Sequence, residues 1–234
     1  MQNGWLAAPE AARLRGLRFP KRRADWLLGR WTAKKAVAIR LGLPRHADSL
    51  ANIEIRQTPS GAPEVLVANE ATPLMISLSH RGGRSICALA PAGEAVGCDL
   101  ELVEPRSDAF VADYFAPEEQ SLAARVSEAD RPLVLALLWS AKESALKALG
   151  TGLRLDTRCV IVSPVDPQPN PKKEAAARGE EWLGRDERAD AREGWRPLRV
   201  RHGGGQVFYG WWFHRDGFLR TAVTSFLCAE PILL

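Results

Sequence analysis

Hydrophobic residues recur along this chain with two different periods. Short runs that alternate apolar and polar residues between Pro and Gly turns predict strands, and longer stretches with an apolar residue every three or four positions predict helices. We expect strands at Ile53–Arg56, Val65–Val67, Met75–Ser79, Ser85–Ala90, Ala95–Leu102 and Cys159–Val162, then an antiparallel meander of Leu198–Arg201, Gln206–His214 and Leu219–Leu227. Helices are expected at Arg22–Leu43, Asp108–Phe115, Pro117–Val126 and Pro132–Leu149. The pattern predicts a fold of the α+β class.

The strand expected at Ala95–Leu102 carries two acidic residues. Apolar residues occupy every second position, so Asp99 and Glu101 fall together on one face of the strand. Two carboxylates on one face lie close enough to share a divalent cation. Taken alone, such a pair is more often the solvated face of an edge strand.

The helix expected at Pro132–Leu149 adds a third carboxylate. Its apolar stripe is formed by Leu138, Ala141, Ala145 and Leu149. Glu143 and Lys147 then project together from roughly the opposite side, one turn apart. With the two acidic residues of the strand they would suit a Mg²⁺-bound pyrophosphate, because hard cations take oxygen ligands. The alternative interpretation of Glu143 and Lys147 is an ordinary surface helix pair.

Three short motifs follow one another in the order typical of a known family. They are S-L-S-H at Ser77–His80, G-C-D-L-E at Gly97–Glu101 and W-x-x-K-E-S-x-x-K at Trp139–Lys147. Together they resemble the signature of the Sfp-type 4′-phosphopantetheinyl transferases, over roughly residues 13–162. The resemblance implies two similar α+β subdomains in a pseudo-twofold arrangement, with the active site in the cleft between them. We expect these subdomains to comprise residues 1–103 and 104–234.

The resemblance also implies an activity and its cofactor. A Mg²⁺-dependent enzyme of the holo-[acyl-carrier-protein] synthase type, with Mn²⁺ as an alternative metal, would transfer 4′-phosphopantetheine from coenzyme A to a serine of an acyl or peptidyl carrier protein. Adenosine 3′,5′-bisphosphate would be released. Asp99, Glu101 and Glu143 would hold the metal, and Glu143 and Lys147 would be catalytic, with the proton transfers between them left open.

The same resemblance places the coenzyme. A basic N-terminal helix would clamp its 3′-phosphate, and the residues expected to do so are Lys21 and Arg22, followed by Arg23 and Lys34. The residues expected elsewhere in the coenzyme site are Ser79, His80, Arg84 and, from the F-A-P-E-E run, Glu119. One departure is the loop Gly61-Ala62-Pro63, where Ala62 replaces a basic residue of many family members. Another cation, such as Arg56, would have to supply that contact.

Composition and charge are those of an ordinary soluble globular protein. The chain of 234 residues is 46% hydrophobic and 26% charged, has no apolar run long enough for a membrane span and shows no secretory signal. Its four cysteines are scattered, which favours buried reduced thiols over disulfides or a zinc site. We therefore expect a cytoplasmic protein that acts as a monomer without binding a membrane or nucleic acid.

The charge is unevenly placed. The net charge is +4, yet residues 1–40 contain ten Lys and Arg against only Glu10 and Asp25, which indicates a polyanionic partner. At the other end, 164–196 begins with four prolines in eight residues and is dense in charge, so we interpret it as an exposed insertion.

Two other functions compete with the transferase hypothesis. A different metal-dependent nucleotidyl or phosphoryl transferase would also use a D-x-E pair, but it would leave the W-x-x-K-E-S-x-x-K motif without a reason. A non-catalytic nucleic-acid-binding module would fit the basic N-terminus, but three converging carboxylates disfavour it. The pathway that the carrier protein serves, whether fatty acid, polyketide or nonribosomal peptide synthesis, cannot be assigned from these motifs.

Overall fold

The computed structural model describes residues 3–59, 61–164, 194–228 and 231. The N-terminal half begins with the helices α1 (Ala8–Gly16), α2 (Pro20–Arg40) and α3 (Ala47–Ala51). Both α1 and α2 carry a proline in the first turn, where a missing backbone N–H removes no helical hydrogen bond. The sequence pattern predicted α2 but neither α1 nor α3.

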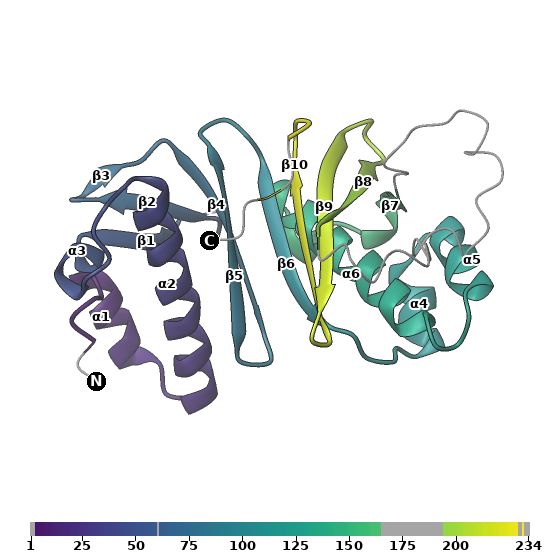
Figure 1. Cartoon of the computed structure of the whole chain (residues 1–234), viewed down its shortest axis with the longest axis horizontal. Coiled ribbons are helices and arrows are strands. Elements are labelled where there is room, and N and C mark those ends of the chain that lie inside the picture. The colour runs from purple at the N-terminus through teal and green to yellow at the C-terminus, as the bar shows by residue number, and fades with distance from the viewer. Residues whose placement is uncertain (1–2, 60, 165–193, 229–230, 232–234) are drawn as a thin grey trace.

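Five strands of the N-terminal half follow α3. β1 (Ile53–Gln57), β2 (Pro63–Val67) and β3 (Glu70–Ala71) form an antiparallel sheet, and β4 (Leu74–Arg81) and β5 (Arg84–Pro91) form a hairpin. Gly82 and Gly83, both with positive φ, make the tight turn of that hairpin. The helix α2 lies alongside β5 in Figure 1 and packs its small apolar residues into the core of this half.

The C-terminal half is built on a five-stranded antiparallel sheet. Its order is β6 (Val96–Leu102), β10 (Phe218–Thr224), β9 (Val207–Arg215), β8 (Arg196–His202) and β7 (Val160–Pro164). The meander expected at the C-terminus is confirmed as β8, β9 and β10. In the register between β6 and β10, Asp99 lies directly opposite Thr221. The edge strand β6 faces the N-terminal half (Figure 1).

Three helices accompany this sheet. They are α4 (Asp108–Tyr114), α5 (Pro117–Arg125) and α6 (Arg131–Ala148), and two 3₁₀ turns at Gly152–Arg154 and Thr157–Cys159 lead from α6 to β7. α6 packs on β6 and β10 on one side and against α5 on another. Its predicted stripe is too narrow, because Lys142 and Ser144 are as fully buried as Leu138 and Ala141. None of the described helices is both long and apolar enough to cross a membrane.

The two halves meet where β4 lies beside β6. Side chains make this contact: the Cys98 backbone N–H donates to Ser77 Oγ at 3.0 Å, and the Cys98 thiol donates to the Ser77 carbonyl at 3.2 Å. The mixed α+β class is thus confirmed, whereas the division at residue 103 stays a prediction. Of the expected insertion, residues 165–193 lie outside the described residues, and its two ends belong to β7 and β8. All four cysteines are free thiols, but the expectation that they are buried holds for Cys98 alone, since Cys87, Cys159 and Cys228 are partly exposed.

Candidate active site

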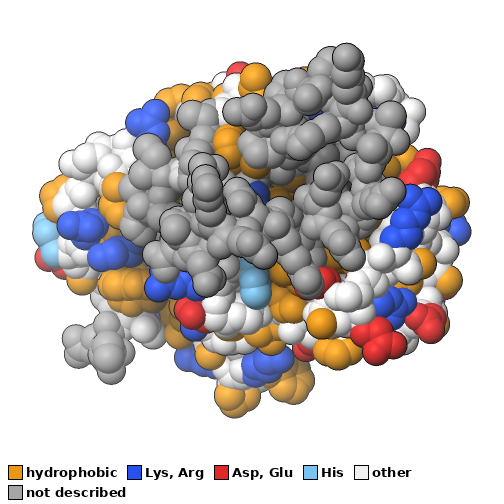
Figure 2. Space-filling view, turned by 45° about the vertical axis from the view of Figure 1, so that its right-hand side comes forward, with side chains coloured by type: hydrophobic (Ala, Val, Ile, Leu, Met, Phe, Trp, Pro, Cys, Tyr) orange, Lys and Arg blue, Asp and Glu red, His pale blue; other side chains and the backbone are white. Residues whose placement is uncertain are grey.

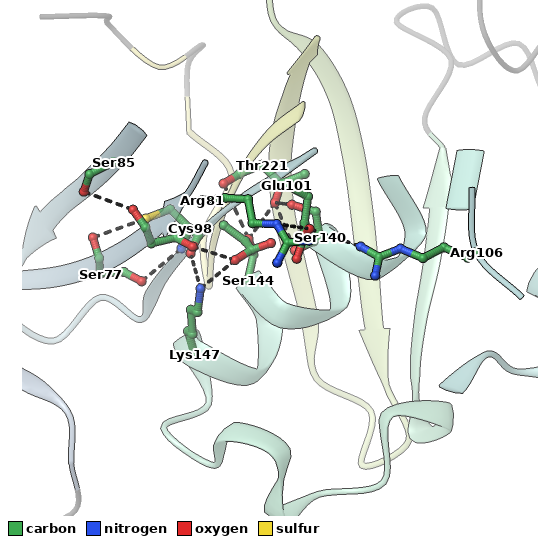
Figure 3. A network of polar contacts seen from close by, with 12 residues as sticks. Ser77, Arg81, Ser85, Cys98, Glu101, Arg106, Ser140, Ser144, Lys147 and Thr221 are labelled. Atoms are coloured by element: carbon green, nitrogen blue, oxygen red, sulfur yellow. Dashed lines mark hydrogen bonds and ion pairs between the residues drawn. The ribbon is translucent and has the colours of Figure 1, made fainter. Parts of the chain in front are cut away.

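Asp99 lies at the centre of a polar network between the two halves (Figure 3). Its Oδ1 accepts hydrogen bonds from Ser79 Oγ on β4 at 2.8 Å and from Lys147 Nζ on α6 at 2.7 Å. Its Oδ2 is buried and has no hydrogen-bond partner among the described residues. One oxygen of the carboxylate is therefore fully used by the protein, while the other is available to a ligand.

Lys147 is fixed between two acceptors on β6. Besides Asp99, its ammonium donates to the Cys98 carbonyl at 3.0 Å. Burial alone would lower the pKa of Lys147, but the negative charges around it, first that of Asp99, outweigh burial and raise that pKa. The side chain is therefore a permanent cation at the edge of the carboxylate.

Glu101 is held by two arginines at the far end of β6. Its Oε2 lies 3.1 Å from Arg106 Nη2 and 3.8 Å from Arg81 Nε. The side chain of Trp139 also hydrogen bonds to this carboxylate. Burial, followed by the nearby charge of Asp99, raises the pKa of Glu101 against the opposing effect of both arginines.

Glu143 faces the same region from α6. It forms no hydrogen bond or ion pair with any other described residue. Its pKa is raised by burial and then by the charges of Asp99 and Glu101, while Lys147 opposes the shift. The three carboxylates predicted from the two motifs are thus close enough to repel one another.

These carboxylates fit a divalent cation in chemistry. Within the described ranges, no three His, Cys, Asp or Glu side chains are already grouped as a metal site, since Lys147 and Arg106 engage Asp99 and Glu101. However, the unpartnered Asp99 Oδ2 and the mutual repulsion of the three groups are both relieved by a hard cation with oxygen ligands. The donor set is all oxygen, as Mg²⁺ or Mn²⁺ requires.

The remaining residues predicted on the β4–β5 hairpin are solvent-exposed. His80 lies near the end of β4, next to Ser79. Arg84 lies 4.3 Å above the Phe218 ring and 3.7 Å from Asp216, so it faces the turn between β9 and β10. Neither contacts the carboxylates in this structure.

The four basic residues predicted for the clamp divide into two classes. Lys21 and Arg22, in the first turn of α2, are exposed and have no hydrogen bond or ion pair to another described residue. Arg23 instead donates to the carbonyls of Leu14 and Leu17 at 2.6 and 3.4 Å, and so fixes the end of α1. Only the first two are free to meet a phosphate.

Lys34 and Glu119 lie in the cores of the two halves. Lys34 Nζ is 2.5 Å from Glu10 Oε2, and Glu119 Oε2 is 2.7 Å from Lys142 Nζ. Both lysine side chains are 0% exposed, and the glutamates are 3% and 1% exposed. Lys34 and Glu119 are thus buried and already paired within the protein, and a role for either in the coenzyme site stays a prediction.

The two buried pairs are built alike. Glu10 and Glu119 are the third residues of α1 and α5, and the paired lysine lies in a longer helix beside an aromatic ring. Each glutamate also accepts from two backbone N–H groups, those of Ala7 and Ile55 for Glu10 and those of Ala116 and Val162 for Glu119. A pseudo-twofold relation between the halves would produce such a repeat, although the relation itself stays a prediction.

Arg81 and Arg106 were missed by the sequence analysis. Arg81 directly follows the S-H pair, and Arg106 directly follows Pro105, five residues after Glu101. Nothing in the sequence pairs either arginine with Glu101, and only the fold brings them together. Arg56 was considered as a substitute for the basic residue that is missing from the Gly61–Pro63 loop. It is exposed but already pairs with Glu64 at 2.5 Å.

Comparisons with known proteins agree with the motifs. Residues 95–195 match the family model of the 4′-phosphopantetheinyl transferase superfamily. The chain is 25% identical over 165 residues to the 4′-phosphopantetheinyl transferase HetI of Nostoc sp. strain PCC 7120, a match that covers 69% of this chain and 67% of HetI. It is 29% identical over 120 residues to slr0495, a candidate 4′-phosphopantetheinyl transferase of Synechocystis sp. strain PCC 6803, over 50% of this chain and 48% of that protein.

Proposed function

We propose that this chain is a 4′-phosphopantetheinyl transferase, like the proteins that it resembles, and that it transfers 4′-phosphopantetheine from coenzyme A to a serine of a carrier protein. The observation that carries the proposal is the divided environment of Asp99. Its Oδ1 is held by Ser79 and Lys147, and its buried Oδ2 is unpartnered beside two further carboxylates. This is the arrangement that a metal-bound pyrophosphate needs.

The reaction is a phosphoryl transfer. The serine Oγ forms a bond to the phosphorus next to the pantetheine arm, the bond from that phosphorus to the bridging oxygen breaks, and adenosine 3′,5′-bisphosphate leaves. The serine proton passes to a base. Such reactions depend mainly on positioning and charge neutralisation. Mg²⁺, or Mn²⁺ in its place, would supply a Lewis acid for the pyrophosphate oxygens.

Each residue of the network has a role in this scheme. Asp99 Oδ2, Glu101 and Glu143 would hold the metal. Glu143 is the candidate base, because its carboxylate has no partner among the described residues and faces the same region as Asp99. Lys147, a fixed cation, would stabilise the leaving phosphate. Ser79 fixes the Asp99 carboxylate from the N-terminal half.

The coenzyme would bind across the two halves. Lys21 and Arg22 are the exposed cations for the 3′-phosphate, and His80 and Arg84 are exposed on the β4–β5 hairpin for the other phosphates. The acceptor would be an acyl or peptidyl carrier protein. We also propose that the enzyme acts in the cytoplasm as a monomer of the Sfp type.

A product assay tests this function against a nucleotidyl transferase that uses the same acidic pair. Purified protein is incubated with Mg²⁺, coenzyme A and an apo carrier protein, and adenosine 3′,5′-bisphosphate is measured by chromatography. We expect release that requires the modified serine of the carrier protein. Release that is equal with a carrier protein whose serine is replaced by alanine would contradict the proposal.

A further inference from the structure

Three hydroxyl groups are buried together between α6 and β10. Thr221 Oγ1 lies 2.8 Å from Ser140 Oγ and 2.7 Å from Ser144 Oγ, and all three residues are 0% exposed. Ser140 and Ser144 are one helical turn apart, so a single threonine on the sheet meets both. Figure 3 shows this cluster beside Cys98 and Lys147.

The hydrogen-bonding capacity of Thr221 is fully used. Its hydroxyl proton is donated to the Ser140 carbonyl at 3.0 Å. The two lone pairs of Thr221 Oγ1 then accept the hydroxyl protons of Ser140 and Ser144. Because buried polar groups cost free energy when they lose a partner, this cluster has one preferred arrangement of α6 on the sheet.

The cluster lies at the level of the proposed metal site. Thr221 is the direct cross-strand neighbour of Asp99 in the pairing of β10 with β6. Ser144 immediately follows Glu143 on α6, and Lys147, less than one turn further along, reaches Asp99 at 2.7 Å. The hydroxyl contacts therefore join the helix that carries Glu143 and Lys147 to the sheet that carries Asp99.

The backbones of α6 and β6 are in direct contact at this level. A Cβ atom added to Gly97 would lie 1.8 Å from the Ser144 carbonyl oxygen. The strand and the helix therefore have no room to move closer, and the hydroxyl cluster links the same helix to β10, the strand paired with β6.

We propose that Thr221 is a positioning residue of the transfer site. Its hydroxyl holds α6 in the register in which Glu143 and Lys147 face Asp99. This inference rests on the proposed function, and it extends the site to the C-terminal strand. Thr221 lies outside all three sequence motifs and outside residues 95–195, which match the family model.

Substitution by valine tests the hydroxyl alone. Thr221→Val keeps the branched shape but removes the hydroxyl that contacts both serines, and leaves Ser144 Oγ only the longer contact, 3.5 Å, with the backbone carbonyl of residue 221. Ser144 would then be free to bond the carbonyl of Ser140, four residues earlier, a bond that bends helices. The expected consequence is a displaced Glu143 and Lys147 in a protein that is still folded.

The experiment compares Thr221→Val and Thr221→Ser with a control, Thr224→Val, on the same strand. Thr224 donates to the Phe226 carbonyl and does not contact α6 through its hydroxyl. Binding of Mn²⁺ to the protein alone is measured from the electron paramagnetic resonance of free Mn²⁺, and kcat and KM for coenzyme A are measured separately. Thermal unfolding shows how much of each variant is folded.

For Thr221→Val we expect weaker Mn²⁺ binding and a kcat lowered by about 10-fold to 100-fold, since a displacement of about 1 Å can cost that much. KM for coenzyme A should change little, Thr221→Ser should recover most of both losses, and Thr224→Val should behave as wild type. A folded Thr221→Val with wild-type kcat and Mn²⁺ affinity would overturn the proposal, as would failure of Thr221→Ser to recover either.

The experiment still tests the proposal if a variant does not fold or if the wild-type protein is inactive. If Thr221→Val does not fold, Ser144→Ala replaces it under the same criteria, because it removes one contact and retains the Thr221 bond to Ser140. If the wild-type protein transfers no phosphopantetheine, the proposed function fails, but the Mn²⁺ affinities still decide whether Thr221 positions the carboxylates.

Discussion

At the scale of single residues, the two carboxylate oxygens of Asp99 differ in their hydrogen bonding. A buried carboxylate oxygen without a partner is costly, so its retention points to a ligand. The other oxygen is held from the N-terminal half by Ser79 and from α6 by Lys147. Asp99 is therefore oriented by both halves of the protein before any ligand arrives.

The exposed cations of α2 lead to a prediction about the coenzyme. Lys21→Ala combined with Arg22→Ala should raise KM for coenzyme A more than KM for dephospho-coenzyme A, because the clamp would act on the 3′-phosphate. The matched control is Arg40→Ala, which removes an exposed cation from the other end of the same helix. Equal effects on both substrates would place the clamp elsewhere.

At the scale of elements, strong periodicity was a reliable guide. The strands β4 and β6 and the helices α2 and α6 lie within a few residues of their predicted positions. α1 was missed because it buries only Glu10 and Leu14, so it shows no apolar stripe. Its place depends on the ion pair of Glu10 with Lys34, a contact between distant residues that periodicity cannot reveal.

Lys34 was assigned to the clamp because its ion pair with Glu10 cannot be recognised in the sequence. A basic residue on a helix is usually exposed, and nothing local indicates that this one is 0% exposed. The sequence therefore located the basic helix but could not separate its exposed cations from its buried one. The burial of Glu119 could not be predicted for the corresponding reason, since its partner Lys142 lies on another helix.

The buried pairs should support stability. Lys142→Met removes the ion-pair partner of the buried Glu119 and should lower the free energy of unfolding by about 3–5 kcal/mol. Lys34→Met should lower it by less, because Arg30 still lies 3.7 Å from Glu10. Urea denaturation followed by circular dichroism measures this, with Lys35→Met, at a half-buried neighbouring position, as the control. A stable Lys34→Met variant with a raised KM for coenzyme A would instead support a role of Lys34 in binding the 3′-phosphate.

The close contact of β6 with α6 can be tested by adding one methyl group. In Gly97→Ala the new Cβ would overlap the Ser144 carbonyl, so the helix must shift and turnover should fall together with stability. Gly29→Ala is the matched control, because its Cβ would meet no neighbouring atom within 4 Å and alanine favours helices. Thermal unfolding and transfer rates unchanged by Gly97→Ala would contradict this contact.

At the scale of the whole molecule, the site is shared between the halves. Ser79 comes from the N-terminal hairpin, Asp99 from the edge strand of the C-terminal sheet, and Lys147 from the helix behind it. The motifs predicted these residues individually. The contributions of Arg81, Arg106 and Thr221 could not be predicted, because they depend on how the strands pair and on which loop returns to the site.

Part of the basic excess of the N-terminal segment is not on the surface of the protein. On the face that Figure 2 shows, the described Lys and Arg side chains are scattered among hydrophobic and acidic ones. Part of the excess is internal, since Lys34 is buried and Arg30 is only 9% exposed. The charge count of the first forty residues therefore overstated the basic surface on offer to a partner.

The central claim is that Asp99 organises a metal-dependent phosphopantetheine transfer. The most direct measurement is the intact mass of an apo carrier protein after incubation with coenzyme A, Mg²⁺ and either wild-type protein, Asp99→Asn or the control Glu64→Gln, which changes a half-buried carboxylate on β2. We predict that wild type and Glu64→Gln add one phosphopantetheine to the serine, that chelation by EDTA prevents it, and that Asp99→Asn is slower by about 10²–10³. No mass gain with wild type, or equal rates for Asp99→Asn at saturating Mg²⁺, would contradict the claim.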